Sequence, residues 1–334
     1  MQDSNTIHYG VLSYPSKNGY FNLGDYIQSL AAMQYLPRID SYIPRDKLNS
    51  KIEEKTIVIM NGWFTHNPEN WPPNDNILPL FVSFHLNSHV AEVLLSKKQN
   101  VEYLKKYSPI GCRDINTVNF LKEKGIDAYY SSCLTTTLDF KYKSKKRTED
   151  IYIVDVLYKN DYKSLYRRSP VRIIPHILKG KFSRRNERDK IIKDLIPQSL
   201  LEKATYLTNS YRSKDYTSEE RFTLAEEMVK KFATAKLIIT SRIHCALPCL
   251  AFGTPVIFVA GGDLNHPNEM SRLKGIIEHM NILSTDNIDL DPSIAKSLTV
   301  LNSENIDWNN ITNPSSYKSF SDELKVKCIS FISE

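Results

Sequence analysis

Residues 236–259, KLIITSRIHCALPCLAFGTPVIFV, contain the pattern that decides the fold of this chain. Leu237–Thr240 is a short apolar run rich in β-branched residues, which is typical of a strand buried on both faces. A helix of small and apolar residues follows, and Gly253 stands where a helix C-cap is expected. Val256–Val259 is a second apolar strand. The stretch therefore predicts one strand–helix–strand unit of an α/β fold.

The turn between that strand and the helix carries Ser241, Arg242 and His244. Open α/β sheets bind ligands at the carboxyl ends of their strands, and a helix N-terminus offers unpaired N–H groups to anions. Arg242 provides a planar fork for a carboxylate or phosphate, and His244 can exchange a proton near neutral pH. We therefore expect an anionic substrate to bind at this turn.

Strands and helices alternate through the rest of the chain. Strands are expected at residues 6–14, 56–60, 79–84, 109–112, 128–133 and 151–157, with further candidates at 172–177 and 204–210. Helices are expected at residues 26–36, 89–107, 115–125, 218–232, 270–279 and 321–332, and one more is expected to start at Asp291–Pro292. The run KYKSKKRTED at 141–150 lacks apolar periodicity and predicts a linker or solvated loop. This pattern predicts two Rossmann-like, doubly wound α/β domains, residues 1–145 and 146–334, the second ending in a C-terminal helix.

The composition limits the class of protein. The chain has 334 residues and a formal net charge of +6, a mild excess that suits anionic ligands or a membrane surface but does not indicate a nucleic-acid binder. The N-terminus MQDSNTIHYG lacks the apolar core of a signal peptide, and no apolar run is long enough to span a membrane. The five cysteines are few and lie in apolar segments. We expect buried, reduced thiols in a cytoplasmic protein.

Four more turns at expected strand ends carry polar residues: Asn22–Asp25, Asn61–Gly62, His85–Asn87 and Arg113–Asp114. Because the carboxyl ends of parallel strands gather at one edge of a sheet, these groups could line one cleft between the domains. The substrate-binding candidates are Asn22, Gly24, Asn61, His85, Asn87 and Ser241, and Gly24 would let the backbone approach a ligand closely. Asp25 is placed either as a helix N-cap or as a group that faces the substrate.

Several common signatures are missing: a GxGxxG loop after a strand, a P-loop, a GxSxG turn and a CxxC pair. Cys245 and Cys249 lie four apart on one helix, but no partner pair has ligand spacing, so packing explains them. Asp289 and Asp291 precede Pro292, so helix capping explains them. We therefore expect neither a metal nor a cofactor.

The tract between Lys163 and Lys193 is markedly basic, because it is rich in arginine and lysine. A solvated helix face explains such a tract, and so does peripheral contact with anionic lipid head groups or a lipid-linked pyrophosphate.

Several motifs resemble those of the polysaccharide pyruvyl transferase family. The turn NLGD at 22–25 resembles the family's Asn-x-Gly-Asp element, and GCRD with Thr117 and the strand AYYSSCLT resembles its middle motif. TSRIHCALPCLAFGTPVIFV resembles the C-terminal signature Ser-Arg-x-His, with Cys245 where the family often has Gly. NGWF and SFH resemble a branch that acts on bacterial surface glycans, as in capsule or exopolysaccharide biosynthesis.

The resemblance implies a GT-B-like fold with an active site between two domains, the first on the acceptor side and the second binding the donor. It implies transfer of the enolpyruvyl group of phosphoenolpyruvate, the donor substrate, onto two hydroxyls of one sugar, with release of phosphate. Arg113, Arg242 and His244 match the positions that hold the donor. Galactose as a 4,6-ketal is the first acceptor expected, on a lipid-linked glycan precursor at the cytoplasmic face of the membrane.

In the mechanism expected, His244 is the general acid, Arg113 and Arg242 neutralise the donor, and Asp25 removes a hydroxyl proton. Two alternatives stay open from the residues alone. One is a glycosyltransferase of the same fold with a nucleotide-sugar donor, and the other is a non-catalytic module that binds glycan or phosphate.

Overall fold

The computed structural model describes residues 7–16, 19–158, 183–261, 272–285 and 299–333, and contains two parallel six-stranded sheets. The first sheet has the order β3-β1-β4-β5-β6-β7 and the second β14-β13-β12-β11-β8-β9. Strands of the first sheet are β1 (His8–Ser13), β3 (Ser41–Pro44), β4 (Thr56–Gly62), β5 (Ile77–Phe84), β6 (Ile110–Cys112) and β7 (Ala128–Tyr130). Strands of the second are β8 (Ile151–Val154), β9 (Thr205–Leu207), β11 (Leu237–Thr240), β12 (Val256–Ala260), β13 (Asn281–Ser284) and β14 (Thr299–Leu301). The predicted α/β class with parallel sheets is confirmed.

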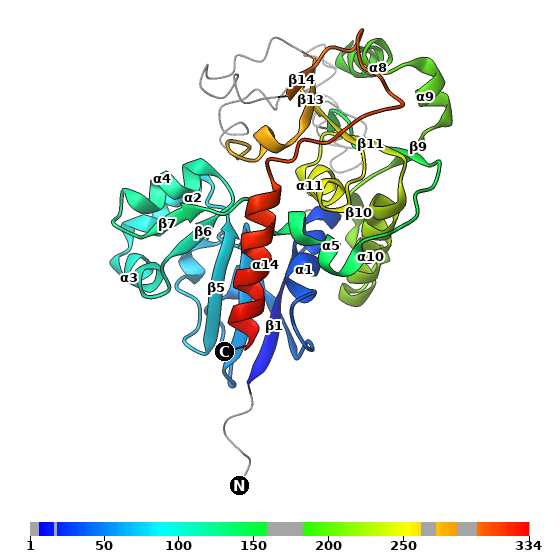
Figure 1. Ribbon diagram of the computed structural model, residues 1–334. Coiled ribbons are helices and arrows are strands. Elements are labelled where there is room, and N and C mark those ends of the chain that lie inside the picture. Colours follow the sequence, from blue (N-terminus) through cyan, green and yellow to red (C-terminus); the bar gives the residue numbers. More distant parts are fainter. Residues whose placement is uncertain (1–6, 17–18, 159–182, 262–271, 286–298, 334) are drawn as a thin grey trace.

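Helices connect these strands and cover the sheets (Figure 1). In the first half they are α1 (Leu23–Met33), α2 (Ser88–Ser96), α3 (Lys98–Lys106), α4 (Ile115–Lys122) and the short α5 (Asp139–Tyr142). In the second half they are α8 (Ser183–Leu195), α9 (Gln198–Lys203), α10 (Ser218–Thr234), α11 (Ile243–Phe252) and the terminal α14 (Lys318–Ser333).

The β11–α11–β12 unit forms as predicted. Every residue of β11 and β12 is buried, and their side chains alternate between two apolar clusters on opposite faces of the second sheet. Helix α11 is buried from His244 to Phe252, as expected for a helix that is apolar all round. Gly253 ends it with φ of 65°, in the left-handed region that glycine adopts without steric cost.

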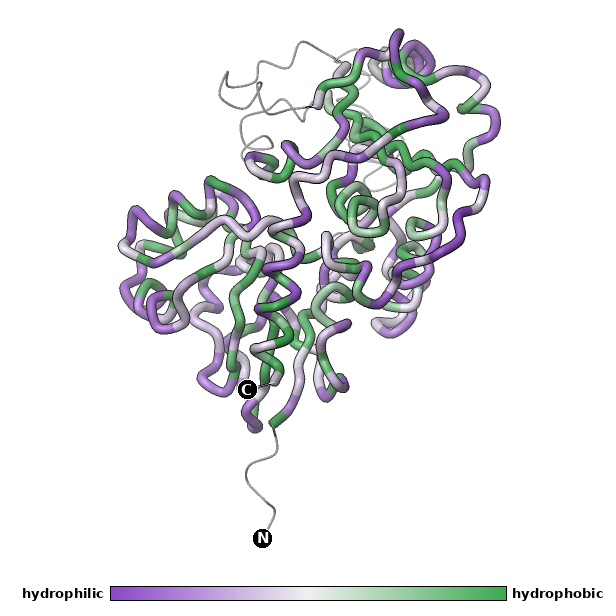
Figure 2. The backbone as a smooth tube through the Cα atoms, in the orientation of Figure 1, coloured by the Kyte–Doolittle hydropathy of each residue, from purple (hydrophilic) through white to green (hydrophobic). Residues whose placement is uncertain are grey.

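The two halves of the chain are joined by more than one connection. Strand β2 (Tyr20–Asn22) pairs antiparallel with β10 (Ser210–Arg212), and Leu23 N–H donates to Asn209 C=O at 2.7 Å. One apolar cluster contains residues of both sheets together with α1, α10 and α11, and Figure 2 shows the hydrophobic segments concentrated along the strands. This shared core holds the carboxyl edges of both sheets toward one another.

The terminal helix α14 lies along the first sheet, although it follows the second sheet in the chain (Figure 1). Its Ser321 hydroxyl donates to Thr136 C=O at 2.9 Å, and Lys325 pairs with Asp139 at 3.0 Å. The division of the chain at residues 145 and 146 stays a prediction.

Two local predictions need correction. Helix α1 starts at Leu23, and its N-cap is Asn22, whose side chain accepts from Gly24 N–H, so Asp25 is not the cap. Residues 277–279 form a single 3₁₀ turn where a short helix was predicted for 270–279. In the run 141–150, predicted as a linker or solvated loop, residues 143–150 form no helix or strand and are mostly exposed, as predicted. Within this loop, the Arg147 guanidinium donates to the Ala233, Ala235 and Phe252 carbonyls and to the Thr254 hydroxyl.

Some predictions fall outside the described residues: the strand at 172–177, the helix start at Asp291 and most of the basic tract 163–193. Within that tract, the Arg188 side chain donates to Val156 C=O at 2.8 and 3.0 Å. None of the helices described is long and apolar enough to cross a membrane. All five cysteines are buried, and none is in a disulfide.

Candidate active site

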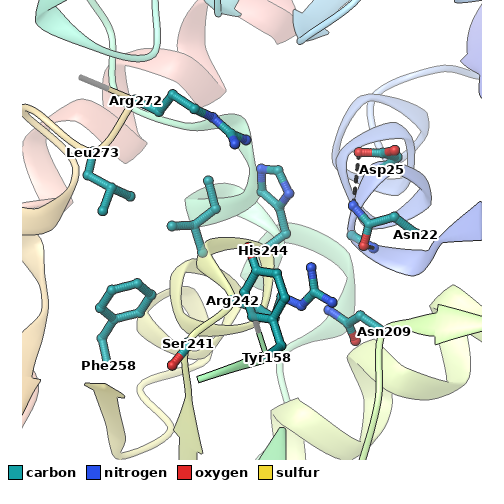
Figure 3. Close-up of a pocket in the computed structure, with 12 residues that line it drawn as sticks. Asn22, Asp25, Tyr158, Asn209, Ser241, Arg242, His244, Phe258, Arg272 and Leu273 are labelled. Carbon is teal, nitrogen blue, oxygen red and sulfur yellow. Dashed lines mark hydrogen bonds between the residues drawn. The ribbon is translucent and has the colours of Figure 1, made fainter. Parts of the chain in front are cut away.

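A pocket lies between the two halves of the chain, at the carboxyl edges of the two sheets (Figure 3). The first turn of α1 lines one side, and the start of α11 with segments that follow β8 and β9 lines the other. The lining residues are Asn22, Gly24, Asp25, Tyr158, Asn209, Ser241, Arg242, Ile243, His244, Phe258, Arg272 and Leu273. The predicted turns at 22–25 and 241–244 therefore meet in one site.

His244 is held at a kink in the first turn of α11. Its backbone has φ of −81° and ψ of 17°, outside the helical range, while the rest of α11 is helical. Pro248 stands four residues later, so it has no N–H to donate to the His244 carbonyl, and its ring crowds that carbonyl. The proline thus explains why the kink falls at the histidine and not elsewhere in α11.

Arg113 reaches His244 from the turn between β6 and α4. Its Nη1 lies 3.5 Å from His244 Nε2, although 131 residues separate the two in the chain. A guanidinium can only donate, so this contact requires the unprotonated Nε2 of a neutral imidazole. Arg113 is 1% exposed, and its Nε and Nη2 have no hydrogen-bond partner among the described residues. Burial lowers the pKa of Arg113 from its ordinary value.

The charge state of His244 follows from the same neighbours. Burial lowers the pKa of His244 well below 6.5, and the positive charges of Arg113 and Arg272 lower it further. The imidazole is therefore neutral at neutral pH when no anion is bound. A bound anion would offset the arginine charges and raise this pKa, so the site links anion binding to proton uptake.

Arg242 is fixed by two contacts from the segment after β8. Its Nε donates to Asp155 Oδ2 at 2.9 Å, and its guanidinium carbon lies 3.4 Å from the centre of the Tyr158 ring. Asp155 holds a left-handed φ of 46° and also accepts from Asn209 N–H at 2.9 Å. A stacked and paired guanidinium keeps its plane in one orientation, which suits a planar anionic ligand.

Asp25 lies across the pocket, in the first turn of α1. Asn22 Nδ2 donates to Asp25 Oδ1 at 3.2 Å, as Figure 3 shows. Burial raises the pKa of Asp25 above its ordinary value, and Arg45 is the strongest of the groups that oppose this shift. The pocket therefore has three arginines and a histidine near one wall and a carboxylate on the other.

A comparison with known proteins places the chain in a family. The sequence pattern of the polysaccharide pyruvyl transferase family matches residues 22–263, well over half of the chain. The chain belongs to this family. None of the curated proteins matches it. A solved structure of a functionally uncharacterised protein from Klebsiella pneumoniae subsp. pneumoniae NTUH-K2044 is similar at a TM-score of 0.42 and 13% identity, over 88% of this chain and 93% of that chain.

The part of the chain that matches the polysaccharide pyruvyl transferase family includes the turn at Asn22–Asp25, Arg113 and the turn at 241–244. These are the residues that meet around the pocket or directly behind it. Arg272, a further cation of the pocket, lies beyond the matched region.

Gly24 is required by the approach of His244. A Cβ at this position would lie 3.1 Å from His244 Cβ and 3.2 Å from its Nδ1, closer than most side-chain contacts. The glycine thus admits the imidazole, a second reason for its presence besides the approach of a ligand to the pocket that it lines.

Gly24→Ala is therefore expected to slow turnover by this transferase about tenfold, because the new methyl group must displace the His244 ring from its position. Alanine favours a helix over glycine by about 0.8–1.0 kcal/mol, so the melting temperature should be unchanged or higher. Steady-state kinetics and thermal unfolding of the same variant check this expectation. Undiminished turnover would show that the close contact does not constrain His244.

The structure places three predicted substrate-binding residues outside the pocket lining and gives each a partner within the fold. Asn61 Nδ2 donates to Gln28 C=O at 3.0 Å, and Asn87 caps α2 by accepting from His89 N–H at 3.0 Å. His85 Nδ1 lies 2.7 Å from Asp114 Oδ2, both fully buried, and burial lowers the pKa of His85 to about 4. Their contact with substrate stays a prediction.

Ser241 lines the pocket, but its hydroxyl is used within the fold. It donates to Val259 C=O at 2.7 Å and accepts from Leu157 N–H at 2.9 Å. These bonds hold the end of β11 to β12 and to the segment after β8, and so fix the position of Arg242.

Sequence reasoning missed Asp155, Tyr158, Asn209 and Arg272. Asp155 directly follows β8 and Asn209 closely follows β9, so the strand-end rule applied in the first half would have found both. Asn209 is 1% exposed, and neither atom of its side-chain amide has a partner in the described part of the chain. No sequence signal marks Tyr158 or Arg272, whose roles depend on the packing of distant segments.

Proposed function

We propose that this polysaccharide pyruvyl transferase moves the enolpyruvyl group of phosphoenolpyruvate onto two hydroxyls of one sugar and forms a cyclic ketal. The observation that supports this most directly is the convergence of Arg113, Arg242 and His244 at one end of the pocket. Two of these residues come from a helix start in the second half, and the third comes from the first half. The pocket between two parallel-sheet halves also supports a GT-B-like arrangement, with the acceptor on the side of residues 1–145.

The charge of the donor fits the charge of the pocket. A phosphate monoester carries about −1.5 to −2 at neutral pH, and the carboxylate of phosphoenolpyruvate adds one more negative charge. Arg242 and Arg272 line the pocket, and Arg113 lies behind His244 with two nitrogens that lack partners in the described region. These guanidiniums offset the donor, and charge-assisted hydrogen bonds to them strengthen as phosphate departs.

The reaction balances with the donor, the sugar and these side chains. Attack of the first hydroxyl on C2 of the donor, with protonation of C3, forms a tetrahedral adduct that carries a new methyl group. Loss of phosphate breaks the C2–O bond, and attack of the second hydroxyl on C2 closes the ketal ring. One hydroxyl proton ends on the methyl carbon and the other leaves with phosphate, so no further reactant is needed.

His244 and Asp25 are the proton-exchanging groups in this proposal. Once the anionic donor raises its pKa, His244 delivers a proton as general acid, and Asp25 accepts a hydroxyl proton on the opposite wall. The first acceptor proposed is a galactoside with free 4- and 6-hydroxyls, on a lipid-linked glycan precursor.

The test is incubation with phosphoenolpyruvate and a panel of galactosides, followed by phosphate release and the mass of the sugar. Ketal formation adds the pyruvyl group to the sugar and releases one phosphate per transfer. A nucleotide diphosphate that raises the melting temperature, while phosphoenolpyruvate does not, would instead indicate a glycosyltransferase. Phosphoenolpyruvate binding without turnover on any acceptor would indicate a binding module.

A further inference from the structure

Arg45 lies beside Asp25 and is not among the residues that line the pocket. It begins the short 3₁₀ helix η1 (Arg45–Lys47) that follows the edge strand β3, and it belongs to none of the motifs described above. Its side chain is only 10% exposed, an unusual degree of burial for an arginine in a surface connection.

The guanidinium of Arg45 is held in one orientation by five contacts with four residues. Its central carbon lies 4.8 Å from the centre of the Tyr14 ring and 5.5 Å from that of Trp63. Nη1 donates to Trp63 C=O at 3.2 Å and lies 3.7 Å from Asp25 Oδ2, while Nε lies 3.6 Å from Asp46 Oδ1. Two aromatic rings and a carbonyl thus aim one N–H edge of the cation toward the Asp25 carboxylate.

We propose that Arg45 is a positioning residue that keeps Asp25 ionised and oriented as the base on the acceptor side of the pocket. This inference rests on the proposed function, since it gives Asp25 its role in proton removal. Arg45 itself does not line the pocket and is not expected to touch the donor.

Other arginines also act on Asp25, but unlike Arg45 they are placed where the anionic donor is expected to bind. Burial raises the pKa of Asp25, and the groups that lower it are, in order, Arg45, Arg272, the Asn22 hydrogen bond and Arg242. Arg272 and Arg242 line the pocket, so a bound anionic donor would offset their positive charge and weaken their effect on Asp25. Arg113 also interacts with Asp25, but it lies behind His244 at the donor end of the pocket, so its charge too is offset by a bound anionic donor. Tyr14 and Tyr26, which also interact with Asp25, are not cations. Arg45 is therefore the cation that still stabilises the Asp25 carboxylate when the donor is bound.

The test is Arg45→Met, which keeps an apolar stem between the two rings and removes the charge. An opposite charge within about 4–6 Å lowers a carboxyl pKa by about 1–3 units, so its loss should move the acidic limb of kcat/KM upward by about one to two pH units. Arg45→Lys keeps the charge without the planar fork and should restore most of the wild-type profile. The matched control is Arg38→Met, which removes another arginine that is paired with an aspartate, Asp40, and that stacks on Tyr9. Its profile should not move.

A second measurement does not depend on transfer. Titration of ¹³C-carboxyl signals, with Asp25 assigned by its loss in Asp25→Asn, reports the ionisation of Asp25 in wild type, Arg45→Met and Arg45→Lys. We expect the same upward shift in Arg45→Met, and equal titration in all three proteins would overturn the proposal. Absence of phosphate release in the wild type would overturn the proposed function and leave this titration as an independent test of the Arg45–Asp25 coupling. If Arg45→Met does not fold, the pKa of Asp25 is measured in the wild type and in Arg45→Lys, each with and without phosphoenolpyruvate. A strong rise of the Asp25 pKa on donor binding in the wild type would contradict the inference.

Discussion

His244→Ala is expected to lower kcat by about 10²- to 10⁴-fold, the usual range for loss of a general acid or base. The substitution should also abolish proton uptake on phosphoenolpyruvate binding, because the His244 imidazole, neutral before the donor binds, is the group expected to gain the proton. Phosphate release measures the first effect, and calorimetric titration in buffers of different ionisation enthalpy measures the second.

The contrast for this prediction is Asp25→Ala. That variant should also lose turnover, but it should bind the donor with linked proton uptake intact, since Asp25 lies on the other wall of the pocket. Equal and mild effects of the two substitutions would contradict the assignment of both residues.

Arg113→Met is expected to lower kcat/KM by roughly 10²- to 10³-fold, as for the loss of one preorganised donor to developing charge. The free energy of unfolding should be unchanged or higher, because an apolar side chain of similar length replaces a fully buried guanidinium, two of whose nitrogens have no hydrogen-bond partner among the described residues. Kinetics and denaturant unfolding on the same protein separate the two effects. A large loss of stability would show that Arg113 has a structural partner that outweighs the cost of burying it.

Arg147→Met provides the matched control for that prediction. This arginine donates four hydrogen bonds that tie the ends of α10 and α11 together, and it lies away from the pocket. Its loss should reduce the free energy of unfolding by about 2–4 kcal/mol, since hydrogen bonds to charged groups contribute about 1.5–3 kcal/mol each before solvent screening. The affinity for phosphoenolpyruvate should not change. The two variants thus compare Arg113, whose expected role is anion binding, with Arg147, whose expected role is stabilising the fold.

The local structure of this protein could be predicted from sequence wherever one short segment contained the whole signal. The strand–helix–strand unit at 237–260 was confirmed because its apolar runs, its glycine cap and its polar turn are all local features. The same unit also contains the reason for the His244 kink, since Pro248 removes the hydrogen bond four residues earlier. Pro248 is therefore a sequence signal that predicts a kink at His244.

Which strand-end residues share the pocket depends on how the two sheets pack. Arg113 meets His244 across 131 residues, and Asn209 meets Leu23 through a backbone hydrogen bond between the two halves. In contrast, Asn61, His85 and Asn87 occupy equivalent strand ends but are bonded within the fold. Periodicity and turn chemistry describe one element at a time, whereas these contacts depend on how two sheets pack over a shared core. Local patterns in the chain therefore predict the helices, the strands and the chemistry of the 241–244 turn, whereas packing brings in the distant arginines that complete the site.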